Sequence, residues 1–245
     1  MLWLLIAAGV WAGVQNALAG GGSFVTLPAL ILCGLDARAA NITSTIALFP
    51  GQVATGLAGR RLVSGANRLS LRALFVISLA GGVVGALLLL ATPPSFFAWL
   101  LPWLVLAATA LFAWGSFLRK PPAHGRPLGA GATGAVQFGI AIYGGYFGGG
   151  IGFLMLAALT IAGLPVRTAG ATKNLLAGVM NGAAVLIFAF SRDVHWLAAV
   201  LLGCGAIAGG LAGAWLLKWV NEKALKVGVV VLGLALAAGL FWRGA

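Results

Sequence analysis

Long apolar stretches separated by short polar connections run through the whole chain, and this pattern predicts a bundle of membrane helices. The apolar segments cover roughly residues 2–19, 23–34, 41–59, 70–91 and 95–118, and then 130–147, 151–163, 168–190, 194–217 and 224–243. A helix needs about 20 apolar residues to cross a bilayer. Segments 23–34 and 151–163 are too short, so we expect each to form a re-entrant hairpin or a broken helix pair with the segment before it. We expect the other three segments of each half to be full spans.

The same pattern occurs twice along the chain. Runs of three glycines, at Gly20, Gly21 and Gly22 and again at Gly148, Gly149 and Gly150, lie 128 residues apart. Segment 81–86 matches 209–214 at the same offset, and Gly34-Leu35 with Arg38 and Thr43 matches Gly163-Leu164 with Arg167 and Thr172 at an offset of 129. An internal duplication of this length predicts two structural repeats, residues 1–118 and 130–245, joined by the polar linker 119–129.

Composition excludes an ordinary soluble domain. Of the 245 residues, 62% are hydrophobic and only 7% are charged, whereas about a quarter of a soluble domain is charged. The chain has 15 Lys and Arg against three acids, and most of these basic residues lie in short loops, where they act as topology signals. Residues 1–19 end in Ala-Leu-Ala, as a secretory signal can, but no Lys or Arg precedes the apolar run. We therefore expect this segment to be retained.

Loop charges predict that the two repeats are inserted in opposite senses. The arginine-rich loop 60–72 and the linker 119–129 should be cytoplasmic, and the uncharged turn 91–95 should face outward. In the second half the pattern inverts, because Arg192 and Asp193 are the only charges in the counterpart of loop 60–72, whereas turn 218–226 is basic. Inverted repeats with broken helices near the membrane midplane are typical of alternating-access carriers.

The two glycine runs are the first candidates for a binding site. A helix that starts just after glycine offers free N–H groups and the positive end of its dipole, which suit an anion. The helix starting at Ser23 and the helix after Gly150 would both do so. The alternative is that these glycines only allow helices to pack closely, as small residues often do in membranes.

Polar side chains inside the predicted spans are the second group of candidates. Lys173 is a charged residue within a membrane segment, which usually indicates function, although its long stem could also carry the charge to the interface. Further candidate ligands are Asn41, Thr45, Gln52, Asn174 and Asn181. Thr45 and Gln52 match Asn174 and Asn181 in the repeat, and the spacing of seven places each pair on one helix face. Hydrogen bonding between helices is the alternative explanation.

Acidic residues are absent from the interior of the predicted spans. Asp36, Asp193 and Glu222 all lie at segment ends or in loops, whereas a cation carrier would be expected to keep a buried acid. The remaining polar groups are mainly donors, which suit oxyanions. We expect a small anionic substrate, no cofactor and no nucleic-acid partner, with a homodimer left open.

The glycine motifs with Asn41-Ile42-Thr43-Ser44-Thr45 and Ala171-Thr172-Lys173-Asn174 resemble those of the sulfite exporter TauE/SafE family, and the likeness covers nearly the whole chain. The resemblance implies a multi-pass permease of a bacterial or archaeal inner membrane, associated with sulfite or organosulfonates. We therefore expect a secondary transporter of a small anion that works by alternating access. A passive channel for anions or small solutes is the main alternative, while an enzyme and a non-transporting assembly subunit fit the residues less well.

Overall fold

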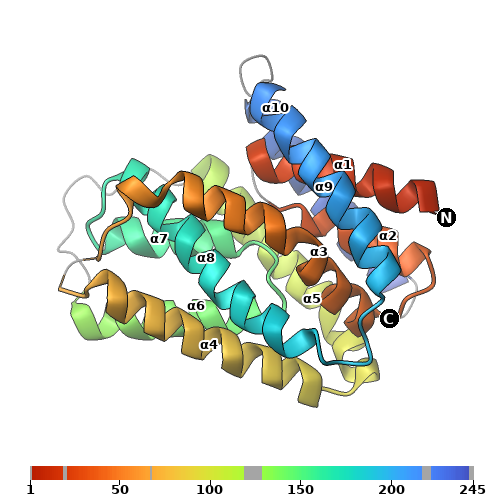
Figure 1. Cartoon of the computed structure of the whole chain (residues 1–245), viewed down its shortest axis with the longest axis horizontal. Coiled ribbons are helices and arrows are strands. Elements are labelled where there is room, and N and C mark those ends of the chain that lie inside the picture. Colours follow the sequence, from red (N-terminus) through yellow and green to blue (C-terminus); the bar gives the residue numbers. More distant parts are fainter. Residues whose placement is uncertain (1, 19–20, 67, 119–128, 217–221, 243–245) are drawn as a thin grey trace.

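The computed structural model describes residues 2–18, 21–66, 68–118, 129–216 and 222–242, which form a bundle of α-helices (Figure 1). The helices are α1 (Leu2–Leu18), α2 (Ser23–Leu32), α3 (Ala37–Ala58), α4 (Leu71–Ala91), α5 (Pro94–Ala113), α6 (Ala130–Tyr146), α7 (Ile151–Ile161), α8 (Val166–Phe188), α9 (Trp196–Leu216) and α10 (Glu222–Trp242). A 3-10 turn, Arg60–Leu62, follows α3, and a π-helical turn, Trp114–Leu118, extends α5. The described residues contain no β-strand, so the predicted all-α fold is confirmed.

Helix lengths agree with the predicted short segments. By length and composition, four helices within the described residues can cross a membrane: Leu71–Ala91, Pro94–Phe117, Val166–Phe188 and Trp196–Gly213. The helices after the glycine runs, α2 and α7, have 10 and 11 residues, so each covers about half of a 30 Å hydrocarbon layer. Helix α3 has 22 residues but is more polar, and the apolar stretch of α10 is shorter. Full spans for these last two helices stay predictions.

The two short helices end in the same way. Gly34 and Gly163 have φ values of 94° and 96°, a backbone conformation that glycine adopts without strain. After each glycine the chain turns back, so that Leu35 N–H donates to Leu30 O at 3.2 Å and Leu164 N–H donates to Leu159 O at 3.1 Å. This is the Schellman arrangement. It explains why a Gly-Leu pair recurs in both repeats.

Contacts between the halves come in matched pairs. Helix α1 packs along α9, and α6, the counterpart of α1, packs along α4, the counterpart of α9. A Cβ on Gly209 would collide with the carbonyl of Val10, and a Cβ on Gly81 would lie 3.0 Å from the carbonyl oxygen of Phe138. These two contacts are equivalent in the repeat. Gly81 and Gly209 lie 128 positions apart, and so do Val10 and Phe138. Glycine thus permits close helix packing at both places.

Equivalent helices of the two halves run antiparallel where they meet. Gly56, near the end of α3, faces the backbone of Asn174 near the start of α8, whereas Phe49 of α3 packs on Gly182 further along α8. Helices α5 and α10 also contact one another in antiparallel order. This arrangement supports a two-fold relation between the halves. Their opposite orientation across a membrane, and the repeat boundaries, stay predictions.

Two threonines at matched positions tie helix ends to loops of the opposite half. Thr43 Oγ1 accepts a hydrogen bond from His195 N–H at 3.2 Å, and Thr172 Oγ1 accepts one from Ser64 N–H at 3.0 Å. The second bond holds the arginine-rich loop 60–72 near the start of α8, at the end of the bundle that is predicted to be cytoplasmic. Most of the other predicted basic regions, 119–129 and 218–226, lie outside the described residues.

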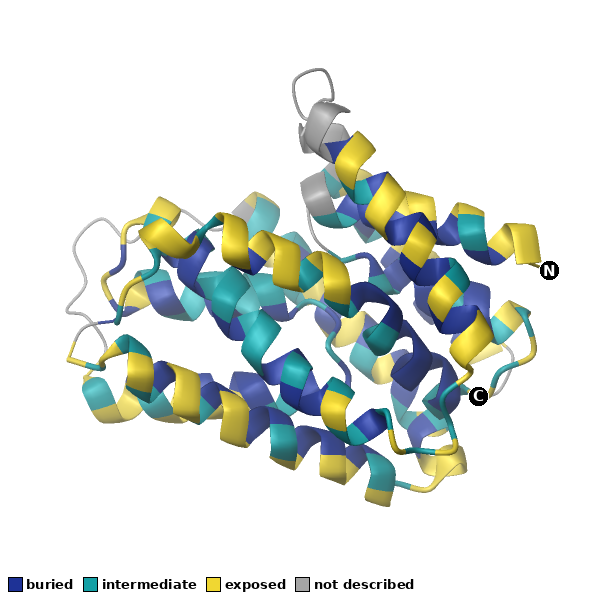
Figure 2. Ribbon diagram, in the orientation of Figure 1, coloured by how far each residue is buried: buried dark blue, intermediate teal, exposed yellow. Residues whose placement is uncertain are grey.

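The surface of the bundle is apolar. Figure 2 shows exposed residues along the outer faces of α1, α4 and α10, and the exposed side chains include many Leu, Val, Phe and Trp. Trp3 is 82% exposed and Trp242 is 92% exposed. Apolar exposure on this scale is typical of a surface that contacts lipid. The protein is a multi-pass membrane protein.

Candidate functional site

The second glycine break separates α6 from α7 and leaves the start of α7 uncapped. Gly148 and Gly150 have φ values of 79° and 74°, so both positions favour glycine. Gly150 directly precedes α7, and no side chain accepts a hydrogen bond from the first turn. The first N–H groups of a helix lack partners within the helix. The break therefore presents backbone donors together with the positive end of a helix dipole.

Lys173 of α8 reaches the same break. Its Nζ lies 3.5 Å from the position that a Cβ on Gly152 would occupy, and Gly152 is the second residue of α7. The last turn of α7 lies close to the start of α8, so the first turn of α7 lies far from the start of α8. The ammonium group thus points toward the break. Within the described part of the chain, no hydrogen bond or ion pair involves this ammonium group.

The first glycine break has a different environment. Gly21 has a φ of 84°, its carbonyl accepts from Gln15 Nε2 at 3.0 Å, and Asn16 Oδ1 accepts from Gly22 N–H at 2.7 Å. Thr26 Oγ1 hydrogen-bonds to Ser44 Oγ at 2.6 Å. Side chains of α1 thus bind the backbone of Gly21 and Gly22, whereas the first turn of α2, like that of α7, has no side-chain cap. Gly20 lies outside the described residues, and Ser23 is the first residue of α2.

Asn41 connects α3 with the end of α6. The side-chain Nδ2 of Asn41 donates to the backbone carbonyl oxygen of Tyr146 at 3.1 Å. The backbone carbonyl oxygen of Asn41 accepts from Thr45 Oγ1 at 2.9 Å. Tyr146 is the last residue of α6 and lies two positions before Gly148. The Asn41 amide therefore holds the chain just before the second break, while the hydroxyl of Thr45 is used within its own helix.

Gln52 and Asn181 meet where α3 and α8 cross. Asn181 Nδ2 donates to Gln52 Oε1 at 2.7 Å, and the two residues are 129 positions apart. They are repeat-equivalent, so their pairing places them close to the axis that would relate the halves. Asn181 is 3% exposed, and its Oδ1 is buried without a hydrogen-bond partner. Asn174 is partly buried two turns earlier on α8.

Some of the candidate residues are brought together and others are not. Gly150 and Lys173 converge at the start of α7, and Asn41 contacts the same region through Tyr146. Gln52 and Asn181 form a separate pair. The contacts of Gly21 and Gly22 are with α1 and α2. That both glycine breaks meet around one anion stays a prediction.

Two polar contacts near the second break are not predicted by the sequence repeat. Tyr146 OH donates to Thr92 Oγ1 at 3.3 Å, and Arg38 forms an ion pair with Asp193 at 2.8 Å. Arg38 recurs in the second repeat as Arg167, and this recurrence is a sequence signal for the arginine. The acidic partner has no counterpart in the first repeat, because the residue 129 positions before Asp193 is Ser64. The described residues contain no cluster of three His, Cys, Asp or Glu side chains that could hold a metal.

Comparison with known proteins gives one consistent result. The sequence model of the family described as sulfite exporter TauE/SafE matches residues 5–240. The chain is 30% identical over 242 residues to the probable membrane transporter protein ORF9 of Sinorhizobium sp, covering 98% of this chain and 92% of that protein. It is 27% identical over 250 residues to the probable membrane transporter protein YfcA of Escherichia coli K12, covering 99% and 90%. A probable membrane transporter protein of Haemophilus influenzae is 25% identical over 252 residues, with 99% and 95% covered.

Proposed function

The chain belongs to the sulfite exporter TauE/SafE family and is a membrane transporter, and we propose that it carries a small sulfur oxyanion by alternating access. Sulfite and organosulfonates are the substrates to test first. The observation that carries the proposal is the convergence of Lys173 on the uncapped start of α7.

Electrostatics at this place favour an anion. A lysine ammonium beside a helix N-terminus places a positive charge next to the positive end of the helix dipole. A helix stabilises cations at its C-terminus instead. An anion between them would accept hydrogen bonds from both the ammonium group and the backbone N–H groups. Hydrogen bonds to charged groups contribute about 1.5–3 kcal/mol each. The bound oxyanion would thus neutralise a charge that has no partner within the described residues.

The donors around the break also fit an oxyanion better than a cation. Lysine and backbone N–H groups donate hydrogen bonds and accept none. Among the acids whose side chains the structure describes, Asp36 caps α3 and Asp193 lies in the turn before α9, so both are at helix ends. We propose that Lys173 supplies charge, that Asn174, Asn181, Thr45 and Gln52 orient the anion, and that the two halves rock against one another.

A flux panel tests the substrate class. Purified protein in proteoliposomes should transport at least one of sulfite, thiosulfate, sulfate or an organosulfonate, and the rate should saturate with concentration. Empty liposomes supply the background. Flux that follows a cation and is indifferent to every oxyanion would reject the proposal, and a rate that rises linearly without saturation would favour a passive channel.

The Gln52–Asn181 pair gives a second test. Replacing either residue with alanine should raise the KM for the transported anion at least about tenfold, because a hydrogen bond to a charged group contributes about 1.5–3 kcal/mol. The matched control is Ser78→Ala, because Ser78 accepts a buried hydrogen bond from Gln137 at 2.9 Å between α4 and α6. If Gln52 and Asn181 serve only to join helices, their variants will lose stability as the control does and keep the parental KM.

A further inference from the structure

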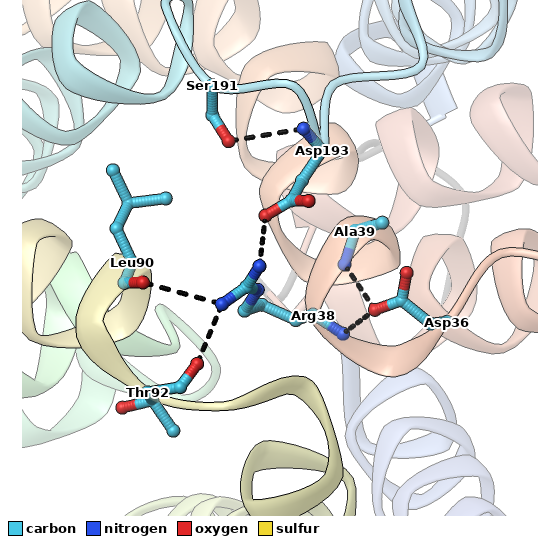
Figure 3. Close-up of polar contacts among 7 residues, drawn as sticks. All are labelled: Asp36, Arg38, Ala39, Leu90, Thr92, Ser191 and Asp193. Atoms are coloured by element: carbon cyan, nitrogen blue, oxygen red, sulfur yellow. Dashed lines mark hydrogen bonds and ion pairs between the residues drawn. The ribbon is translucent and has the colours of Figure 1, made fainter.

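Arg38, at the start of α3, binds two different parts of the protein at one end of the bundle (Figure 3). One guanidinium nitrogen lies 2.8 Å from Asp193 Oδ2. Another donates to the carbonyl oxygen of Thr92 at 2.7 Å and lies 3.4 Å from that of Leu90. Asp193 belongs to the turn between α8 and α9, whereas Leu90 and Thr92 are at the end of α4. The ion pair therefore joins the first half of the chain to the second.

The ion pair is partly shielded from solvent. The side chain of Arg38 is 16% exposed, that of Asp193 is 25% exposed, and Arg38 Nε is buried without a partner. Partly buried charge pairs are screened less by salt than exposed ones. Removing one partner is costly because it leaves the other charge buried and unpaired. Loss of either partner should therefore weaken the contact between the two halves at this end of the bundle.

The same network reaches the second glycine break. Thr92, whose carbonyl accepts from Arg38, also accepts at its hydroxyl from Tyr146 OH at 3.3 Å. The carbonyl of Tyr146 in turn accepts from Asn41, one turn after Arg38 on α3. Tyr146 is therefore held at both its side chain and its backbone, two positions before Gly148. A chain of hydrogen bonds thus runs from the ion pair to the residue two positions before Gly148.

At the opposite end of the bundle, neutral hydrogen bonds join the two halves. Arg167, the counterpart of Arg38, is exposed. The bonds that join the halves there run between Thr172 Oγ1 and the backbone of Ser64, at 3.0 Å to its N–H and 3.3 Å to its carbonyl oxygen. The end that carries Arg38 has an equivalent neutral bond, between Thr43 and His195. The charged contact of Arg38 is thus an addition to the neutral bond at its own end of the bundle.

We propose that Arg38 is a positioning residue of the outer gate. Its ion pair with Asp193 closes the end of the bundle that is predicted to face outward, and its bond to Thr92 holds Tyr146 and the second break in place. Outward opening requires the ion pair to separate. The inference rests on the proposed transport function, since only a transporter needs a gate at this end.

Thiol labelling tests the gate without any substrate. The reporter is Ala184→Cys in a background in which Cys33 and Cys204 are replaced by alanine. Ala184 is fully buried on α8, one turn before Ile187, which lines a groove of about 480 Å³ beside the ion pair. Asp193→Asn removes the charge and keeps the shape of the side chain. A membrane-impermeant maleimide added from outside should label the reporter about tenfold faster in this variant, corresponding to about 1.4 kcal/mol lost from the closed state.

Asp36→Asn is the matched control, because Asp36 caps α3 next to Arg38 through its contacts with the N–H groups of Arg38 and Ala39. Asparagine caps a helix about as well as aspartate, so labelling should stay at the parental rate. Asp193→Glu, which keeps the charge, should restore slow labelling. Unchanged labelling in Asp193→Asn, or equal acceleration in Asp36→Asn, would overturn the gate. Labelling needs no anion, so this experiment tests the gate even if the protein transports no oxyanion.

Discussion

Replacing Lys173 with glutamine is expected to lower oxyanion transport at least tenfold at subsaturating substrate while leaving the folded protein intact. The reason is that the ammonium group points at the start of α7 and has no hydrogen bond or ion pair within the described residues. Its charge-assisted hydrogen bond to a bound anion should contribute about 1.5–3 kcal/mol. A charge inside a membrane segment is costly for folding, so the variant should be no less stable than the parent. Initial uptake rate and thermal stability in detergent are the two measurements.

Arg167→Gln supplies the control for this experiment. Arg167 lies six residues earlier on the same helix, is exposed, and loses the same charge on substitution. It should keep the parental rate. If Lys173→Gln transports as well as Arg167→Gln, then Lys173 only places its charge at the membrane interface, and the proposed anion site is wrong.

Replacing Gly85 with valine should prevent stable folding. Gly85 lies where α4 packs on α6, and a Cβ there would collide with the carbonyl of Ile142 and lie 2.8 Å from the backbone nitrogen of Tyr146. Both obstacles are backbone atoms, so no side chain can move aside to make room. We expect a destabilisation of at least about 3 kcal/mol, at the upper end of the cost of overpacking. The measurement is the fraction of protein that stays monodisperse in detergent after heating.

Gly139→Val is the matched substitution. Gly139 is inside α6, is exposed, and a Cβ there would meet no atom within 4 Å. Because valine is a better helix former than glycine, this variant should be as stable as the parent. Equal stability of the two variants would show that α4 and α6 are not packed as described.

Much of the fold follows from the sequence because repetition and hydropathy reflect strong physical constraints. Backbone groups cannot be left unpaired in lipid, so apolar segments predict helices, and the glycine runs predict where helices stop. The Gly-Leu pairs at residues 34 and 163 recur because both short helices end with a left-handed glycine. The helix order and the short lengths of α2 and α7 were therefore predictable.

The candidate site was less predictable, because equal positions in a repeat need not have equal environments. The sequence favours treating both glycine runs alike. Yet Gln15 and Asn16 bind the backbone of Gly21 and Gly22 at the first break, and the repeat places Tyr143 and Gly144 at the corresponding positions of the second half, where no such amide exists. The ion pair of Arg38 with Asp193 depends on how a turn of one half folds against a helix of the other. Spacing along the chain carries no information about such a contact.

Sulfite counterflow is the most direct test of the proposal that this protein is an oxyanion carrier. Proteoliposomes loaded with unlabelled sulfite are diluted into a trace of radiolabelled sulfite, and the label inside is followed with time. A carrier that exposes one site alternately to the two sides should accumulate the label transiently above its external concentration, and Lys173→Gln should not. Label that only equilibrates, or that accumulates equally in the Lys173 variant, would contradict the account.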